Sequence, residues 1–464
     1  MLNYFRFKKL NGQYLITNEF GRFAFLDKTQ LRDLMAGQLP QGSDLWSHLE
    51  QEGFVFSGSI PAFTAENTHR MRDSKNYLFG ATSLHIFVVT TACNMRCVYC
   101  QANSGTGPTP GWMNRETAMR AVDVALQSPD LHLTFEFQGG EPLLNFPVIR
   151  TIVEYAESKR ADKIIQYSVV SNLTLLTDEM ISFFAQYRVG VSTSLDGPAW
   201  LHNVNRPYRE QTAGTYADVV SGVARLRAAG VQVGAIQTTT RNSLAHAREI
   251  VDSYCDNGFD LIFLRPLTPL GCANKEWAEI GYTPDEFNRF YQEALDYIIE
   301  KNRQGHRLQE GHAAIFFSKI LHGYPVNYME LRSPCGAAVG QMAYYCNGDV
   351  FTCDEARMLY EMGNDAFRLG NVKEQQYTDL VSTPACRAIC LSSITEAIPS
   401  CCDCVYQPYC GVCPVINLAL YQDLMPKTPN HYRCSIYGGM LDTLFGWIQH
   451  SDTETLKLLE SWYA

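Results

Sequence analysis

Three cysteines, Cys93, Cys97 and Cys100, have the residue type and spacing of an open iron–sulfur site. They are spaced C-x3-C-x2-C and follow an apolar run, 85–90, that predicts a strand. Three thiolates hold three irons of a [4Fe–4S] cluster and leave the fourth iron for a small molecule that binds through nitrogen and oxygen. A zinc site is the alternative, but zinc takes a fourth Cys or His close by, and none follows.

A second set of cysteines lies near the C-terminus: 11 of the 16 cysteines fall between Cys335 and Cys434. No early segment has the apolar core of a signal peptide, so we expect a reducing, cytoplasmic location, where dense thiols bind metals rather than form disulfides. No run approaches the length of a membrane span. The formal net charge of −10 argues against nucleic-acid binding.

The elements that must position these residues form a repeating pattern between 84 and about 304. Apolar runs alternate with helical periodicity, which predicts an α/β fold with a parallel sheet and helices outside it. Right-handed crossovers curl such a sheet into a full or partial barrel, here (β/α)6. The expected strands are 85–90, 131–137, 164–171, 189–195, 231–239 and 261–264, and the expected helices are 115–127, 147–160, 178–186, 215–229, 245–257 and 284–302. Catalytic groups of such barrels lie on loops after the strands, where the first three cysteines fall.

Four segments are expected along the chain. Residues 1–80 predict a small α+β module of the winged-helix kind, with a hairpin at Asn11-Gly12 and a polar linker over 60–80. Residues 81–305 predict the barrel. Residues 306–435 are rich in Cys, Gly and Pro and need metal for stability. Residues 436–464 predict one closing amphipathic helix, over 436–463.

The run CNMRCVYC, from Cys93 to Cys100, resembles the signature of the radical S-adenosylmethionine (SAM) superfamily. The resemblance implies that the open iron binds the amino and carboxylate groups of SAM, and that an electron then produces a 5′-deoxyadenosyl radical. It also implies that Tyr99 packs on the adenine. Gln138, Gly139, Gly140 and Glu141 look like the family's GGEP element, which receives the SAM amino group. A tight strand-to-loop turn explains these four residues equally well.

Three further residues are candidates for contacts with the SAM ribose and carboxylate: Asn172, Ser194 and Arg206. Ser194 lies in a segment after the fourth strand that is also similar to the family. Turn capping and surface pairing are the alternative roles for all three.

The second set of cysteines resembles the SPASM extension of radical SAM enzymes that modify peptides and proteins. The resemblance implies one or two auxiliary [4Fe–4S] clusters. The distal cluster would take Cys401, Cys404, Cys410 and Cys434. The nearer one would take Cys335, Cys353 and Cys413, with Cys346 as a candidate fourth ligand. One step departs from the pattern, since two residues rather than three separate Cys410 from Cys413. Zinc sites of the C-x2-C type are the alternative.

Asp354 directly follows Cys353 and is the candidate catalytic residue. In the sulfatase-maturing relatives an Asp at this place removes a substrate proton, which a carboxylate does when its pKa is tuned. Accepting backbone hydrogen bonds is the alternative role.

The layout as a whole resembles the radical SAM maturases of His-Xaa-Ser systems, from the opening NYFRFKKLNGQYLITNEFGRFAFL to CDEAR and CGVCPV. The implied partners are a peptide or small protein substrate, a second radical SAM maturase, and a reductant such as flavodoxin or ferredoxin. The N-terminal module is similar to peptide-recognition elements, with Tyr14 to Phe25 as the sheet edge that takes up a leader segment. Covering one end of the barrel is its alternative role. A sulfatase-type maturase and a non-catalytic iron–sulfur electron-transfer or scaffold protein are the alternative functions.

Overall fold

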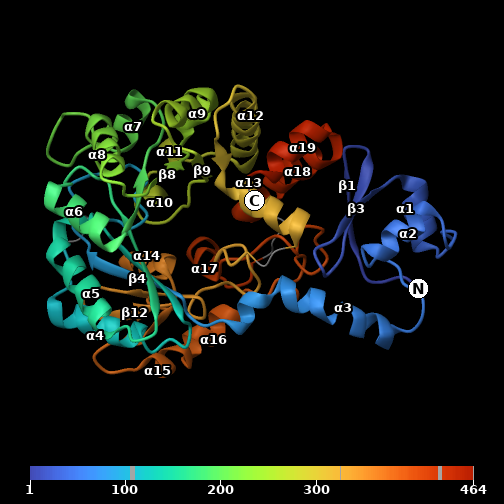
Figure 1. Ribbon diagram of the computed structural model, residues 1–464, viewed down its shortest axis with the longest axis horizontal. Coiled ribbons are helices and arrows are strands. Elements are labelled where there is room, and N and C mark those ends of the chain that lie inside the picture. The colour runs from blue at the N-terminus through green and yellow to red at the C-terminus, as the bar shows by residue number, and fades with distance from the viewer. Residues whose placement is uncertain (105–109, 324–325, 427–430, 463–464) are drawn as a thin grey trace.

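The computed structural model describes residues 1–104, 110–323, 326–426 and 431–462. Figure 1 shows an N-terminal module at one end of the molecule and a helix-covered sheet at the other. The helices α17, α18 and α19 lie between them, and β12, α14 and α15 lie beside the sheet. Among the described residues, no helix combines the length and apolar character that crossing a membrane requires.

The centre of the fold is a parallel sheet whose strands follow one another in chain order. It contains β4 (Leu84–Thr90), β5 (His132–Gly139), β6 (Ile164–Val170), β7 (Gly190–Ser194), β8 (Val233–Thr238) and β9 (Leu261–Arg265). Its crossovers carry α4 (Arg115–Ala125), α5 (Phe146–Lys159), α6 (Asp178–Tyr187), α8 (Tyr216–Ala228) and α9 (Ala247–Asp256), and α12 (Pro284–Arg303) follows β9. The sheet does not close on itself, so the fold is a partial barrel. The α/β partial barrel predicted from the sequence is confirmed.

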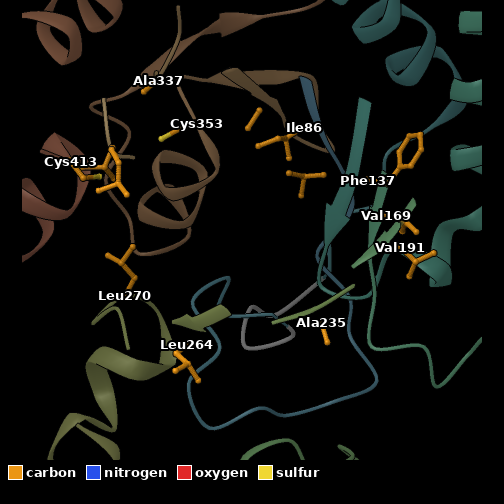
Figure 2. Close-up of a cluster of buried hydrophobic side chains, with 14 of the residues drawn as sticks. Ile86, Phe137, Val169, Val191, Ala235, Leu264, Leu270, Ala337, Cys353 and Cys413 are labelled. Carbon is orange, nitrogen blue, oxygen red and sulfur yellow. The ribbon is translucent and has the colours of Figure 1, made fainter. Parts of the chain in front are cut away.

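The two faces of the sheet differ in chemistry because successive side chains of a strand point to opposite sides. Phe137, Val169, Val191 and Leu264 are buried in the apolar core that the helices share (Figure 2). The alternate residues, among them Glu136, Gln138, Ser168, Ser194 and Arg265, are half-buried. A polar inner face is thereby available at the end of the strands where the first cysteine loop begins.

The cysteine-rich region continues this sheet rather than forming one of its own. β11 (Gln341–Tyr344) pairs in parallel with β4, and β12 (Asp349–Phe351) and β13 (Arg368–Asn371) follow in antiparallel order. On the opposite edge, the short β10 (Gln309–Glu310) pairs with β9. The region's helices are α13 (Gly311–Phe317), α14 (Asp354–Glu361), α15 (Tyr377–Val381), α16 (Pro384–Leu391) and α17 (Pro414–Tyr421). This pairing attaches the cysteine-rich region to β4, the strand that the first cysteine loop follows.

The N-terminal module is a three-stranded antiparallel sheet packed on helices. Its elements are β1 (Arg6–Leu10), β2 (Gln13–Thr17), β3 (Phe23–Leu26), α1 (Lys28–Met35) and α2 (Asp44–Gln51). Asn11 and Gly12 have φ values of 48° and 86°, as the predicted hairpin turn requires. β2 is the central strand, so the prediction of Tyr14 to Phe25 as a continuous sheet edge is wrong. The edges are β1 and β3, and Phe23 and Phe25 of β3 pack against Phe445.

The predicted linker over 60–80 is also wrong, because residues 60–74 form a 15-residue helix, α3 (Ile60–Ser74). The Ser59 side chain caps it by accepting the Ala62 N–H. Phe63 stacks on Phe56 and so attaches this largely polar helix to the module. A polar helix with one narrow apolar contact has the composition of a linker, so the sequence pattern does not reveal it as a helix.

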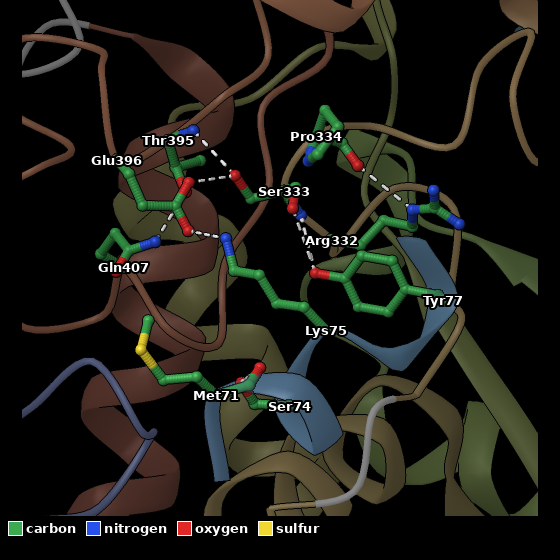
Figure 3. A network of polar contacts seen from close by, with 10 residues as sticks. All are labelled: Met71, Ser74, Lys75, Tyr77, Arg332, Ser333, Pro334, Thr395, Glu396 and Gln407. Carbon is green, nitrogen blue, oxygen red and sulfur yellow. Dashed lines mark hydrogen bonds and ion pairs between the residues drawn. The ribbon is translucent and has the colours of Figure 1, made fainter. Parts of the chain in front are cut away.

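The end of α3 is bound to the cysteine-rich region, as Figure 3 shows. Lys75 forms an ion pair with Glu396, which also accepts a 2.5 Å hydrogen bond from the Ser333 hydroxyl. The Tyr77 hydroxyl donates to the Ser333 carbonyl at 3.2 Å. These contacts place the N-terminal module against the segment that leads into Cys335.

The C-terminal segment contains two helices instead of the single one predicted. α18 (Tyr432–His450) ends before Ser451, and α19 (Thr453–Glu460) starts with Asp452 as its cap, accepting the Thr455 N–H at 2.8 Å. Residue 463, the predicted end of the helix, lies outside the described residues. The remaining elements are α7 (Ala199–Asn205), α10 (Cys272–Lys275), α11 (Trp277–Ile280), a π-helix over Ser318–His322, and 3-10 turns over Asn76–Phe79, Pro142–Asn145 and Arg241–Ser243.

Candidate active site

Cys93, Cys97 and Cys100 lie together on the loop that follows β4. Burial and the neighbouring Cys97 and Cys100 raise the pKa of Cys93 to about 12, and burial raises that of Cys97 to about 11. Thiols in such surroundings ionise when a cation is bound. In the described ranges no three Cys, His, Asp or Glu side chains converge on a single-ion position, as zinc needs. The three thiols fit three corners of a larger iron–sulfur cluster.

A second segment, 205–209, holds this loop in place through backbone hydrogen bonds. The Arg96 N–H donates to the Pro207 carbonyl and the Val98 N–H to the Asn205 carbonyl, both at 2.9 Å. The Arg209 N–H donates to the Asn94 carbonyl at 3.0 Å. No motif in the sequence indicates this contact, because it is made by main-chain atoms of a distant loop.

Tyr99 and Arg206 form a buried network with Asp196 beneath the loop. The Tyr99 hydroxyl donates to Asp196 at 2.8 Å and accepts from Arg206 Nη1 at 2.8 Å. Burial alone would lower the pKa of Arg206, but the Cys97, Tyr99 and Asp196 groups hold it well above its usual value. A fixed positive charge beside Cys97 favours the thiolate that a cluster needs. Tyr99 is only 6 % exposed, and its contact with adenine stays a prediction.

Gly139 and Gly140 allow β5 to approach the backbone that leads into Cys93. A Cβ at Gly139 would lie 2.1 Å from the Thr90 carbonyl oxygen, and one at Gly140 would lie 2.2 Å from that of Ala92. The Gly140 N–H donates to the Thr90 carbonyl at 2.8 Å. The glycines are therefore required for contact between two loops, in addition to any contact with SAM.

The Glu141 carboxylate is buried and already bonded within the protein. It accepts the Leu143 N–H at 3.0 Å, the Ser171 hydroxyl at 2.8 Å and the Asn172 N–H at 2.8 Å. Burial nevertheless raises its pKa. In this structure Glu141 joins the ends of β5 and β6, and its contact with the SAM amino group stays a prediction.

Asn172 bridges the cysteine loop and the loop after β6. Its Nδ2 donates to Asn94 Oδ1 at 2.9 Å, and its Oδ1 accepts the Thr174 N–H at 3.0 Å. Turn capping, the alternative role for Asn172, is the one its contacts describe. Ser194 ends β7 half-buried, and Gln138 donates to Glu136 at 2.5 Å on the inner face.

Cys335, Cys353 and Cys413 form a second group of thiols, which we call the near site. Cys353 and Cys413 are the N-caps of α14 and α17, and Figure 2 shows both apart from the strands that carry Phe137 and Val191. Burial and then the neighbouring Glu355, Cys413 and Cys335 groups hold the pKa of Cys353 well above its usual value. The backbone N–H groups of Ala356 and Ile416, in the first turns of these helices, act to lower the pKa of Cys353 and of Cys413. Two helix N-termini thus point partial positive charge at this site.

Cys401, Cys404, Cys410 and Cys434 form a third group, the distal site. Burial is the main cause that raises the pKa of Cys410, and the other three thiols follow as the next causes. A Cβ at Gly411 would lie 2.3 Å from the Glu330 carbonyl oxygen, so the chain passes closely behind this residue. Although only two residues separate Cys410 from Cys413, the two thiols have different cysteine neighbours and belong to different sites.

Cys346 does not belong to the near site, and this corrects its proposal as a fourth ligand. It lies at the turn between β11 and β12, against Gly111, where a Cβ would come within 2.3 Å of its sulfur. Cys353 lies beyond the opposite end of the same hairpin. The three residues of β12 lie between the two, a span of roughly 10 Å along the strand. β12 therefore carries the chain away from Cys346 before it reaches Cys353.

Asp354 is held by a buried arginine that the sequence interpretation did not include. Its Oδ1 accepts bonds from Arg357 Nε at 3.0 Å and Nη2 at 2.5 Å, and the Arg357 side chain is 1 % exposed. On the inner face, burial raises the pKa of Glu136, and the Asp354 charge raises it further. Asp354 therefore lies near β5. The i, i+3 spacing of Asp354 and Arg357 was the signal available in the sequence.

These features define an α/β partial barrel with an open cluster site on its first loop and further cysteine sites beside it. Residues 87–252 match the family model described as the Radical SAM superfamily. An uncharacterized protein of Methanocaldococcus jannaschii, MJ0907, is 30% identical over 220 residues, which cover 47% of this chain and 74% of the relative. The chain belongs to the radical SAM superfamily. It is an enzyme of a family that uses a [4Fe–4S] cluster and SAM.

Characterised relatives include enzymes that modify proteins. A cysteine-type anaerobic sulfatase-maturating enzyme of Clostridium perfringens strain 13 is 25% identical over 312 residues, covering 65% of this chain and 80% of the relative. The structure of anSMEcpe with bound AdoMet superposes with a TM-score of 0.68, at 21% identity, over 79% of this chain and 97% of that one. Streptococcus suis SuiB bound to precursor peptide SuiA gives a TM-score of 0.54, at 15% identity, over 91% and 96%.

Proposed function

We propose that this enzyme is a maturase that modifies a ribosomally made peptide or small protein. The observation that carries the proposal is the position of Asp354. It follows Cys353 of the near site directly, and its charge raises the pKa of Glu136. Glu136 lies two residues before Gln138, where β5 enters the turn that contacts the Cys93 loop. A substrate side chain on the inner face would lie between the SAM site and the near site. The relatives named above modify sulfatases or bind a precursor peptide, which supports this substrate class.

The cofactor and the protein would divide the chemistry. SAM bound at the first cluster would supply radical chemistry for removing a hydrogen atom from the substrate. Cys93, Cys97 and Cys100 hold the cluster, and the buried Arg206 stabilises the loop's negative charge. Arg357 fixes the Asp354 carboxylate through Oδ1, which leaves Oδ2 to accept a substrate proton. The near and distal sites would hold the auxiliary clusters.

The N-terminal module offers a place for the substrate's leader segment. An apolar groove of about 260 Å³ lies between α3 and the start of the chain. Its lining includes Leu2, Phe20, Phe56, Ile60 and Phe63, and Ile60 is 64% exposed. Because α3 also leads through Lys75 into the near-site segment, a leader bound here would bring the attached core toward the inner face.

A His-Xaa-Ser protein is the substrate we favour, on the resemblance of the whole layout to the maturases of such systems. Sulfatase-type maturation, which oxidises Ser or Cys to an aldehyde, is the second candidate. It is favoured by the sulfatase-maturating relatives and by Asp354 directly after Cys353. The substrate separates the two, since the active-site groups are shared.

The test uses anaerobically reconstituted wild type beside a variant with Cys93, Cys97 and Cys100 replaced by Ala. With SAM and dithionite, only the wild type should form 5′-deoxyadenosine. Each protein is then co-expressed with a His-Xaa-Ser repeat protein or with a sulfatase fragment, and the product is mapped by mass spectrometry. Modification of the first protein alone supports the proposal, and an aldehyde in the second supports the sulfatase function. A wild type that forms no 5′-deoxyadenosine contradicts both and supports a scaffold.

A further inference from the structure

Lys319 places a positive charge beside the distal site. Its ammonium donates to the Tyr409 carbonyl at 2.8 Å, and Tyr409 directly precedes Cys410. It also donates to the Leu331 carbonyl at 2.5 Å. Lys319 and Cys410 line the same cavity, which has a volume of about 50 Å³. The ammonium and this thiol of the distal site are therefore close neighbours.

The backbone around this lysine is unusual. Lys319 lies in the π-helix Ser318–His322, which continues α13. Such turns are rare and occur frequently at functional sites. The segments that the ammonium joins are closely packed, since a Cβ at Gly411 would lie 2.9 Å from the Leu331 Cα. Lys319 thus joins the segment that leads to Cys335 of the near site to the segment that carries the distal site.

The cavity around Lys319 has more positive than negative groups in its lining. Its charged residues are Lys75, Lys319, Arg332, Glu19 and Glu396. Glu396 pairs with Lys75, and Figure 3 shows these two side chains pointing toward each other. Glu19 accepts a 3.1 Å hydrogen bond from Asn3. Among the described residues Lys319 forms no ion pair, and its two hydrogen bonds go to uncharged carbonyls. A half-buried ammonium in this position is costly unless a negative group lies near it.

We propose that the Lys319 ammonium is the counter-charge of the cluster held by the distal site and that it raises the reduction potential of this cluster. The inference rests on the proposed function only in that the distal site binds a cluster. An iron–sulfur cluster with four thiolate ligands is an anion, and reduction adds a negative charge to it. A fixed positive charge beside Cys410 therefore stabilises the reduced form more than the oxidised form. The distal cluster accepts an electron more readily as a result.

The test uses the full chain with the three cysteines of the first cluster replaced by Ala, so that only the auxiliary sites contribute to the spectra. In this background Lys319 is kept, changed to Met or changed to Arg. Lys163→Met is the matched control, because the half-buried Lys163 also donates to two backbone carbonyls, those of Ser128 and Asp130. Cys434→Ser, at the exposed cysteine of the distal site, identifies the signal of the distal cluster. Iron is counted, and midpoint potentials are measured by EPR during titration with dithionite.

We expect about eight irons in the parent, in both Lys319 variants and in the control. The midpoint potential of the distal signal should be lower in Lys319→Met than in the parent, whereas Lys319→Arg and the control should keep the parent value. Loss of about four irons in Lys319→Met alone would also support the proposal, because the anionic cluster then lacks its counter-charge.

Two results would overturn the inference while leaving the proposed function in place. One is an unchanged distal potential in a Lys319→Met protein that keeps its iron. The other is an equal fall in Lys319→Met and Lys319→Arg, which would show an effect of packing and not of charge. Only about four irons in the parent would instead contradict the second auxiliary cluster of the proposed function, and this inference with it.

Discussion

Replacing Gly140 by Ala tests whether the contact between β5 and the first cysteine loop sets the geometry of the SAM site. The added Cβ would lie 2.2 Å from the Ala92 carbonyl oxygen and 2.6 Å from its carbonyl carbon. Ordinary van der Waals contact requires the two loops to move apart by about 1 Å. Ala92 directly precedes Cys93, so this displacement passes to the first ligand of the cluster.

The expected effects follow from that displacement. A misplacement of 1 Å costs a reaction about 100-fold in rate, so 5′-deoxyadenosine formation by Gly140→Ala should fall by about that factor. Overpacking should lower the free energy of unfolding by about 1–3 kcal/mol. The assay is SAM cleavage under dithionite on anaerobically reconstituted protein, with iron content measured beside it and urea unfolding followed by circular dichroism.

Gly234→Ala is the matched control, because Gly234 lies on β8 of the same sheet and a Cβ there would meet no atom within 4 Å. It should cleave SAM at the wild-type rate. A Gly140→Ala enzyme that stays within about threefold of the wild type would refute the reasoning. It would mean that the loop tolerates the displacement or that Gly140 does not control the position of Cys93.

Three further predictions concern the buried groups around the site. Asp354→Ala leaves the buried Arg357 unpaired and should lower the free energy of unfolding, measured in urea, by about 3–5 kcal/mol. Changing both residues to apolar ones should recover most of this loss. An equal loss in the single and the double variant would contradict the prediction. Cys346→Ser should keep the wild-type iron content while Cys413→Ser loses iron, and equal iron loss in the two would restore Cys346 as a ligand. Burial lowers the pKa of His85 to about 3. As the pH drops below about 6.5, His85 therefore binds a proton in the unfolded chain but not in the folded protein, and the free energy of unfolding falls. From pH 7 to 5 the wild type should lose about 2 kcal/mol more than His85→Gln, and parallel pH curves would contradict this.

The sequence determined the elements of the barrel to within a few residues. Alternating apolar runs and helical periodicity are local properties, and β4 to β9 and their helices lie where the patterns predict them. It also grouped the cysteines, since the C-x3-C-x2-C and C-x2-C-x5-C spacings are local as well. The order of parallel strands then follows from short right-handed crossovers.

Local pattern failed where a residue's role depends on a distant neighbour. α3 has the composition of a linker, and its contacts with Phe20, Phe56 and Glu396 come from elsewhere in the chain. Cys346 is near Cys353 in the sequence, but it lies at the hairpin turn and β12 carries the chain away from it. Tyr14 was expected at a sheet edge, and the pairing of β2 on both sides places it in the middle.

Only the tertiary structure assigned partners to the charged groups of the site. The hydrogen bond from Arg206 to Tyr99 joins two separate loops, and the influence of Asp354 on Glu136 joins α14 to β5. The pairing of β11 with β4 is the cause, because it brings the cysteine-rich region to the inner face of the barrel. Sequence spacing specifies which residue types are present, and long-range strand pairing decides which of them share a buried space, where the charge of one group shifts the pKa of the next.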